Sequence, residues 1–325
     1  MFAEKSICIT PTPKGWNELS SELSTIKPDD LVVVSDMTGT LITQTANGML
    51  PAMRESQRVL LERGLMMVLA TADSGHSVTE FLLKPLGAVK DEQLYVVHSV
   101  GAWRGRVVAG QLVELSSGAD LKETDRRTLI GAMDRAICCA VGCDTPVFSE
   151  VLRDDLIGSG RRFSLTSISD SFGTQSFIEI LPSKAAIFFH EQNIAGPIQQ
   201  KIFSDYINDP AVVQIVSDNG YKLIRGGNYV DVFTCTKEQG VRYILDCVNP
   251  TERRCLIVLG DSENDLGILS AEYPEFDRVL RVFVGQSKLV VDTIMSRPVS
   301  TEFFSMPGKY CHGSTELFQA LAKSR

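Results

Sequence analysis

The sequence has no long apolar run. No stretch of the 325-residue chain approaches the roughly 18 uninterrupted apolar residues of a membrane helix. Its first residues, MFAEKSICITPTPKG, also lack the basic start and long apolar middle of a signal peptide. We therefore expect a cytoplasmic globular protein with no membrane partner.

Positive charge is also in short supply. The chain has 32 Lys and Arg against 40 Asp and Glu, a formal net charge of −8. This excess of acid argues against a nucleic-acid partner, because binding to DNA or anionic lipid needs clustered cations. If the substrate is a phosphate, local groups must overcome the repulsive field of the protein, and a bound cation does this directly.

Cysteine is too sparse and too scattered for a disulfide framework. Eight cysteines are spread over the whole chain, so we expect reduced thiols. Cys138, Cys139 and Cys143 form the one tight group, but no second Cys/His pair at zinc-ligand spacing completes a four-ligand site. We therefore assign no zinc to this group.

Short apolar runs are what the sequence does have. Runs of this length are typical of strands buried on both faces of a parallel sheet. They are Leu31–Val34, Leu65–Ala70, Leu94–Val97, Leu256–Leu259 and Val279–Val284. Helical patterns lie between them: one ends at Gly64, and Ser77 with Glu80 has the spacing of a capping box. This alternation predicts an α/β fold with a doubly wound parallel sheet and a ligand crevice beyond the carboxyl ends of its strands.

Two regions depart from that alternation. Residues 1–28 read as an extension with one short helix around Trp16–Leu23. Residues 118–226 predict helices and antiparallel strands with short turns. The expected helices are Leu121–Ile137 and Pro197–Ile207, and the expected strands are Phe163–Ile168, Phe177–Leu181, Ala185–Phe189, Val212–Val216 and Tyr221–Arg225. We expect an inserted α+β cap domain here, with the core in 29–117 and 227–325 and its pattern resuming at Tyr229–Thr234.

Polar residues that can carry chemistry follow the expected core strands. Asp36 ends a buried strand and enters the turn Met37-Thr38-Gly39-Thr40, and Thr71 follows the next strand. Lys237 opens a helical segment, where a cation opposes the helix dipole and hints at an anionic partner. A further strand leads into the acidic segment Asp261-Ser262-Glu263-Asn264-Asp265.

The order and chemistry of these four motifs resemble the haloacid dehalogenase superfamily, from about residue 30 to the C-terminus. A cap between the second and third motifs is similar to the Cof-type branch, which includes many sugar phosphatases. His98-Ser99-Val100-Gly101-Ala102 stands where that branch usually has Asn-Gly-Ala, so the asparagine is missing.

The resemblance implies a phosphatase that acts on a small phosphorylated substrate through an aspartyl-phosphate. A carboxylate that attacks an anionic phosphate is repelled by it, so a hard cation must bind both. Asp36 would be the nucleophile, and Lys237 would stabilise charge during transfer. Mg²⁺ would be held by Asp36, the backbone carbonyl of Thr38, Asp261 and Asp265. Phosphoryl oxygens would be held by the backbone N–H groups around Met37–Gly39, by Thr71 with Ala72, and by Lys237, with Asn264 orienting this shell.

Thr38 departs from the family pattern, and this leaves three functions open. The usual residue is a second aspartate that protonates the leaving group and activates water, whereas a threonine hydroxyl has no accessible ionisation near neutral pH. The protein could be a phosphatase whose leaving group needs no proton or receives one from the cap. It could also be a phosphotransferase with a long-lived phosphoenzyme, or a binding protein without turnover.

Overall fold

The computed structural model describes residues 12–43, 48–87, 93–118, 120–159, 162–165, 176–189, 196–226, 229–250 and 252–324. The chain forms two compact units. The first comprises Met1–Val96, Gly105–Val113 and Val241–Arg325, and the second comprises Val97–Arg104 and Glu114–Gly240. An eight-stranded sheet and a five-stranded sheet organise the fold.

The eight-stranded sheet contains the five apolar runs that were expected as core strands. In spatial order its strands are β13 (Phe303–Ser305), β12 (Arg278–Phe283), β11 (Cys255–Gly260), β1 (Leu31–Ser35), β2 (Met66–Ala70), β3 (Leu94–His98), β4 (Trp103–Val108) and β5 (Gln111–Ser117). The five strands from β13 to β2 are parallel neighbours. All residues of β1, β2 and β11 are buried, as expected for strands covered on both faces. The hairpin of β4 and β5 was not predicted.

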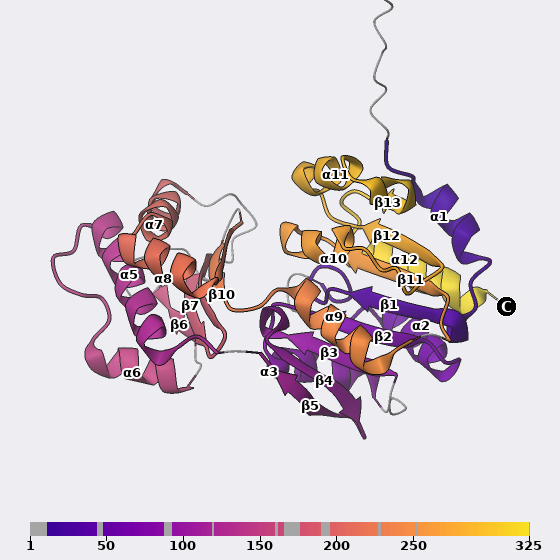
Figure 1. Ribbon diagram of the computed structural model, residues 1–325, viewed down its shortest axis with the longest axis horizontal. Helices are drawn as coiled ribbons and strands as arrows, with labels where there is room; N and C mark the ends of the chain where they lie inside the picture. Colours follow the sequence, from indigo (N-terminus) through magenta and orange to yellow (C-terminus); the bar gives the residue numbers. More distant parts are fainter. Residues whose placement is uncertain are drawn as a thin grey trace, which may run out of the picture. The chain divides into compact units, whose positions relative to one another are not determined.

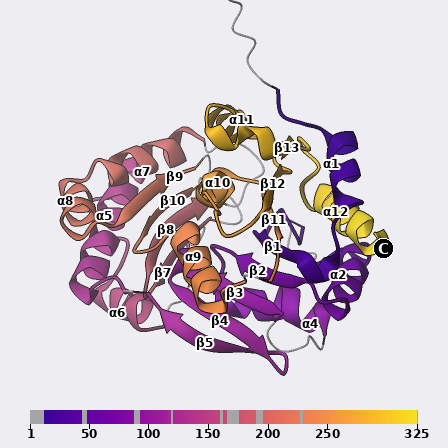
Figure 2. The ribbon, with the colours of Figure 1, turned by 45° about the vertical axis from the view of Figure 1, so that its right-hand side comes forward.

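Helices cover both faces of the parallel part of this sheet. The helices of the first unit are α1 (Trp16–Leu23), α2 (Pro51–Glu62), α3 (Gly75–Val78), α4 (Lys84–Leu86), α10 (Leu266–Ser270), α11 (Lys288–Met295) and α12 (Tyr310–Lys323). Figures 1 and 2 show α1, α2 and α12 on one side of the sheet and α10 on the other. The fold is therefore the doubly wound α/β arrangement that the alternating pattern predicts. Short helical segments lie at η1 (Pro28–Asp30), η2 (Thr79–Leu83), η3 (Ser99–Gly101), η6 (Glu263–Asp265) and η7 (Pro298–Glu302).

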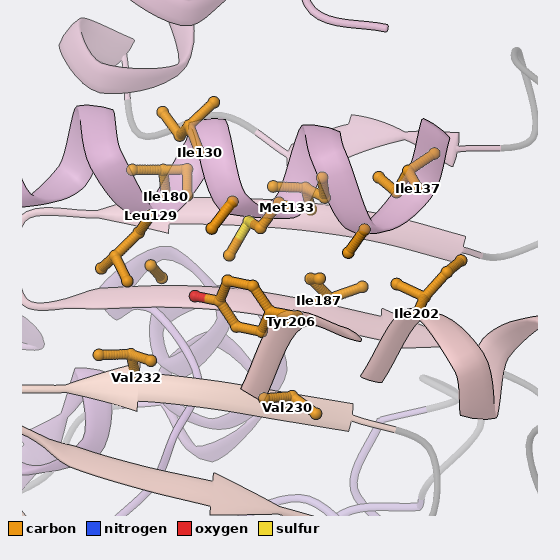
Figure 3. Close-up of a cluster of buried hydrophobic side chains, with 14 of the residues drawn as sticks. Leu129, Ile130, Met133, Ile137, Ile180, Ile187, Ile202, Tyr206, Val230 and Val232 are labelled. Atoms are coloured by element: carbon orange, nitrogen blue, oxygen red, sulfur yellow. The ribbon is translucent and has the colours of Figure 1, made fainter. Parts of the chain in front are cut away.

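The second unit has its own antiparallel sheet and its own core. The sheet order is β6 (Arg162–Ser164), β7 (Ser176–Leu181), β8 (Lys184–Phe189), β10 (Tyr229–Phe233) and β9 (Lys222–Arg225). The helices are α5 (Glu123–Val141), α6 (Glu150–Ser159), α7 (Pro197–Ile207) and α8 (Pro210–Asn219), and α9 (Lys237–Val248) runs from this unit into the first. Side chains of α5 and α7 pack on one face of the sheet. Met133, Tyr206 and Ile187 belong to the same buried hydrophobic cluster (Figure 3).

Three local predictions were wrong. Val212–Val216 is not a strand but part of α8. Asp209 caps this helix by accepting a hydrogen bond from the Ala211 N–H, and Pro210 is the first residue of the helix. Gly220 ends the helix in the left-handed conformation. Tyr229–Thr234 does not resume the core, because β10 pairs antiparallel with β8 and β9 of the second sheet.

The third correction concerns the start of the helical segment after β2. Ser74, not Ser77, is the N-cap: the Ser77 N–H donates to Ser74 Oγ, and Glu80 instead pairs with Lys84 four residues on. Of the expected strand Phe163–Ile168, residues 163–164 lie in β6, Leu165 follows β6, and residues 166–168 lie outside the described residues. None of the helices in the described ranges is long and apolar enough to cross a membrane.

Candidate active site

Asp36 and Asp261 leave the sheet at the same edge. β1 and β11 are parallel neighbours with Ser35 opposite Leu259, and the Asp36 N–H donates to Leu259 O at 3.1 Å. Because carboxyl ends of parallel strands meet at one edge, residues 225 positions apart in the chain are brought together. The sequence predicted this convergence.

Three carboxylates meet at this edge. One ligand oxygen from each of Asp36, Asp261 and Asp265 lies within 4.8 Å of the others. Their side chains are buried, with exposed fractions of 5%, 8% and 0%. Two like charges 4 Å apart repel by about 4 kcal/mol at an effective dielectric constant of about 20, so a carboxylate group of this kind favours a bound cation.

Neighbouring donors fix the orientation of two of these carboxylates. Asp265 Oδ2 accepts hydrogen bonds from the Asp261 and Ser262 N–H groups at 3.0 and 3.1 Å and from Ser262 Oγ at 3.2 Å. Asp261 Oδ1 accepts from the Thr40 hydroxyl at 3.0 Å. Asp265 therefore caps the turn that carries Asp261.

Two glycines are required by the close approach of the backbone to Asp261. Gly39 has φ +86°, and a Cβ on it would lie 2.3 Å from Asp261 Oδ2. A Cβ on Gly285, in the loop after β12, would lie 1.8 Å from Asp261 O. The Gly39 N–H donates to Ile42 O at 2.9 Å. This amide, which was expected to bind the phosphate, therefore forms a hydrogen bond within its own turn.

Thr38 and Thr71 meet at a carboxylate that the sequence analysis did not single out. The Thr38 hydroxyl donates to Asp73 Oδ2 at 2.8 Å, and the Thr71 hydroxyl donates to the same oxygen at 3.0 Å. The Asp73 N–H donates in turn to Thr71 Oγ at 3.1 Å. Ala72 lies half-buried between Thr71 and Asp73. The only signal for Asp73 in the sequence is its place two residues after Thr71, immediately before a helix cap.

Lys237 lies at the start of α9, which packs against a strained turn of the second unit. It is the first residue of α9 and is 4% exposed. Ser99, Val100 and Gly101 all have positive φ, at 52°, 58° and 95°, which is rare for a β-branched residue such as Val100. A Cβ on Gly101 would lie 2.0 Å from Thr236 O, so this turn packs directly against the start of α9. Lys237 belongs to the second compact unit, whereas Asp36, Asp261 and Asp265 belong to the first.

His98 precedes that turn and is kept neutral. Its ring stacks on Trp103 with centroids 4.4 Å apart, and its Nδ1 lies 2.9 Å from Ser99 Oγ. Burial lowers the pKa of His98 to about 4. Met37 is fully buried, and Asn264 lies half-buried in η6 between Asp261 and Asp265.

The residues present fit a divalent metal ion. The converging groups are all carboxylate oxygens, the donors that Mg²⁺ prefers, and their buried negative charge is what the ion would neutralise. Asp36, Asp261 and Asp265 would hold the ion, with the backbone carbonyl of Thr38 beside them as the resemblance implies.

The first and fourth motifs thus lie at the ends of adjacent parallel strands, β1 and β11. No family model and no curated protein matches the sequence. Among solved structures, a trehalose-6-phosphate phosphatase from Aspergillus fumigatus matches with a TM-score of 0.52 at 11% identity, over 97% of this chain and 100% of that chain.

Two further structures match at a similar level. One is described as a putative phosphate protein from Eubacterium rectale, with a TM-score of 0.50 and 14% identity over 89% of this chain and 97% of that one. The other comes from work on a trigonal-bipyramidal intermediate in a phosphoryl-transfer superfamily, with a TM-score of 0.51 and 14% identity over 88% and 95%. At these identities the likeness establishes the fold, and the expected fold class is confirmed.

Proposed function

We propose that this protein is a magnesium-dependent phosphatase that cleaves a small phosphorylated metabolite through an aspartyl-phosphate on Asp36. The observation that carries the proposal is the buried group of Asp36, Asp261 and Asp265 at the ends of β1 and β11. The fold shared with phosphatases, one of them named for trehalose 6-phosphate, supports this class of substrate.

In this mechanism the residues of the chain have separate tasks. Asp36 attacks phosphorus, the bond from phosphorus to the leaving-group oxygen breaks, and the leaving group departs as an oxyanion that takes its proton from solvent. Asp265 holds the turn that carries Asp261, and Asp261 is fixed by the Thr40 hydroxyl. Mg²⁺, when bound, would offset the charge of the carboxylates and of the phosphate. Lys237 would add a cation to the transferring group.

The second compact unit would act as a cap that selects the organic part of the substrate. It is built around its own sheet and core, and its segments are inserted in the sequence of the first unit. We retain the cytoplasm as the expected compartment and a small phosphorylated molecule as the expected partner.

Asp36→Asn tests the proposal. A panel of phosphate esters, acyl phosphates and phosphonates that includes trehalose 6-phosphate would be assayed with Mg²⁺ and with EDTA. Because Asn is a poor nucleophile of nearly the same shape, turnover should be lost while the unfolding temperature is retained. Asp246→Asn is the matched control, because Asp246 is exposed on α9. If Asp36→Asn keeps more than a few per cent of wild-type activity, Asp36 is not the nucleophile.

One observation favours a phosphotransferase as the second candidate. The Thr38 hydroxyl donates its only proton to Asp73, so it cannot at the same time protonate a leaving group or activate water. A phosphoenzyme would then persist and could pass its phosphoryl group to another acceptor. In that case wild type accumulates a hydroxylamine-sensitive phosphoenzyme that decays faster when an acceptor alcohol is added than in water alone. A phosphoenzyme whose decay no acceptor accelerates favours the phosphatase.

A further inference from the structure

The Asp73 side chain is fixed in place beside the threonine that replaces the family's second aspartate. Its Oδ2 accepts hydrogen bonds from both threonine hydroxyls, and its own N–H closes the network on Thr71. The two hydroxyl donors limit rotation of the carboxylate, and the N–H bond ties the Asp73 backbone to the same network. The side chain is half-buried, so it is open to a small molecule such as water.

One oxygen of this carboxylate remains available for a further hydrogen bond. Oδ2 takes both hydroxyls, whereas Oδ1 accepts no hydrogen bond from the residues that the structure describes. An ionised carboxylate has two acceptor oxygens, and this one would receive a donor from water or ligand. Thr38 thus links the nucleophile turn to a carboxylate that has a spare acceptor.

We propose that Asp73 Oδ1 orients the water that hydrolyses the phosphoenzyme, an inference that rests on the proposed aspartyl-phosphate chemistry. One O–H of the water donates to Oδ1, which turns a lone pair of the water oxygen toward phosphorus. The bond from water oxygen to phosphorus forms, and the bond from phosphorus to the Asp36 oxygen breaks. Both hydrogens of the water leave with the phosphate, and Asp36 returns as a carboxylate.

This role needs an acceptor in the right place rather than proton transfer in the transition state. Phosphoryl transfer passes through a loose transition state in which the attacking oxygen is weakly bonded, so the orientation of water is a large part of what the protein supplies. Asp73 would therefore perform in this protein the water-directing part of the work that Thr38 cannot perform.

Asp73→Asn separates this role from the clamp on the threonines. The amide oxygen can still accept from Thr38 and Thr71, but the other atom becomes an NH₂ group, which donates to water and occupies the lone pair needed for attack. Asp73→Ala removes both oxygens. It is a second variant in which no amide can rotate to place its oxygen at the position of Oδ1. Asp246→Asn again serves as the exposed control.

The experiment follows the two half-reactions separately in full-length protein with Mg²⁺. Rapid quench with p-nitrophenyl phosphate measures formation of the phosphoenzyme, and intact mass together with hydroxylamine sensitivity measures its decay. We expect formation within about threefold of wild type. Decay should slow by about 10²-fold in both Asp73 variants, with the phosphoenzyme visible by mass. Combining Thr38→Asp with Asp73→Asn moves the carboxylate back to position 38 and should restore decay.

The other outcomes overturn the inference in distinguishable ways. Formation and decay slowed together would make Asp73 a structural clamp. Decay unchanged in both variants would exclude a role for Oδ1. A wild-type protein that turns over without any phosphoenzyme, and an Asp36→Asn variant that stays active, would overturn the proposed function itself and this inference with it.

Discussion

The two units of this protein each bury a cluster of ionisable side chains, but they neutralise the charge differently. In the first unit the buried carboxylates of Asp36, Asp261 and Asp265 converge. In the second unit buried Lys184 lies 3.3 Å from Glu179 and 3.7 Å from Asp231, so the chain supplies its own cation. The second cluster therefore contains a cation of the chain, and we propose Mg²⁺ as a cation that binds the first.

The largest effect on stability is expected when Lys184, the cation within the second cluster, is removed. Lys184→Met leaves Glu179 and Asp231 buried without it, and breaking a buried ion pair on one side costs about 3–5 kcal/mol of unfolding free energy. Burial already raises the pKa of Asp231, so this carboxyl will take up a proton and recover part of the loss at low pH. Urea unfolding measures the effect. Lys222→Met, at an exposed lysine of β9, should change little, and equal stability of the two variants would contradict the assignment.

His98 shows a third way of burying an ionisable group, by keeping it neutral. Its pKa is lowered to about 4 in the folded protein, while the unfolded chain has the ordinary value near 6.5. The unfolded state therefore binds the proton first, so stability falls as pH decreases from about 6.5 to about 4, by at most about 3 kcal/mol. His98→Phe can still stack on Trp103 but cannot be protonated. Urea unfolding across this pH range should show a shallower decline for the variant, and parallel curves would refute the assignment.

The smallest effect on stability is expected from a change in the group of Asp36, Asp261 and Asp265. Asp261→Asn keeps the oxygen that accepts from Thr40 but removes one negative charge from the three. Without metal the variant should be more stable by about 1 kcal/mol, because repulsion is relieved. With Mg²⁺ the order should reverse, because affinity falls by about tenfold or more and wild type gains more from the ion. Thermal unfolding with and without Mg²⁺, and calorimetry of the binding, test both halves. Equal Mg²⁺ affinity would show that Asp261 is not a ligand.

Local sequence patterns and the order of motifs along the chain were sufficient to predict much of the structure of the first unit. The apolar run before Asp36 and the run before Asp261 are buried strands, and Trp16–Leu23 is the helix that its pattern predicted. Parallel strands end at a common edge, so convergence of the two aspartates followed from the fold class. The role of each residue at the phosphate stays a prediction, and Lys237 is known here only as the buried start of α9.

In the first unit the sequence by itself determined which segments become buried strands and which carboxylates end them, because those depend on periodicity and on residues close in the chain. Tertiary structure alone decided that β10 joins the second sheet, since strand pairing depends on competition between partners remote in sequence. It also decided that the Asp73 carboxylate accepts a hydrogen bond from the Thr38 hydroxyl, 35 residues earlier in the chain. A hydrogen bond of that kind leaves no periodic trace in the sequence, because it depends on how two loops meet at the end of the sheet.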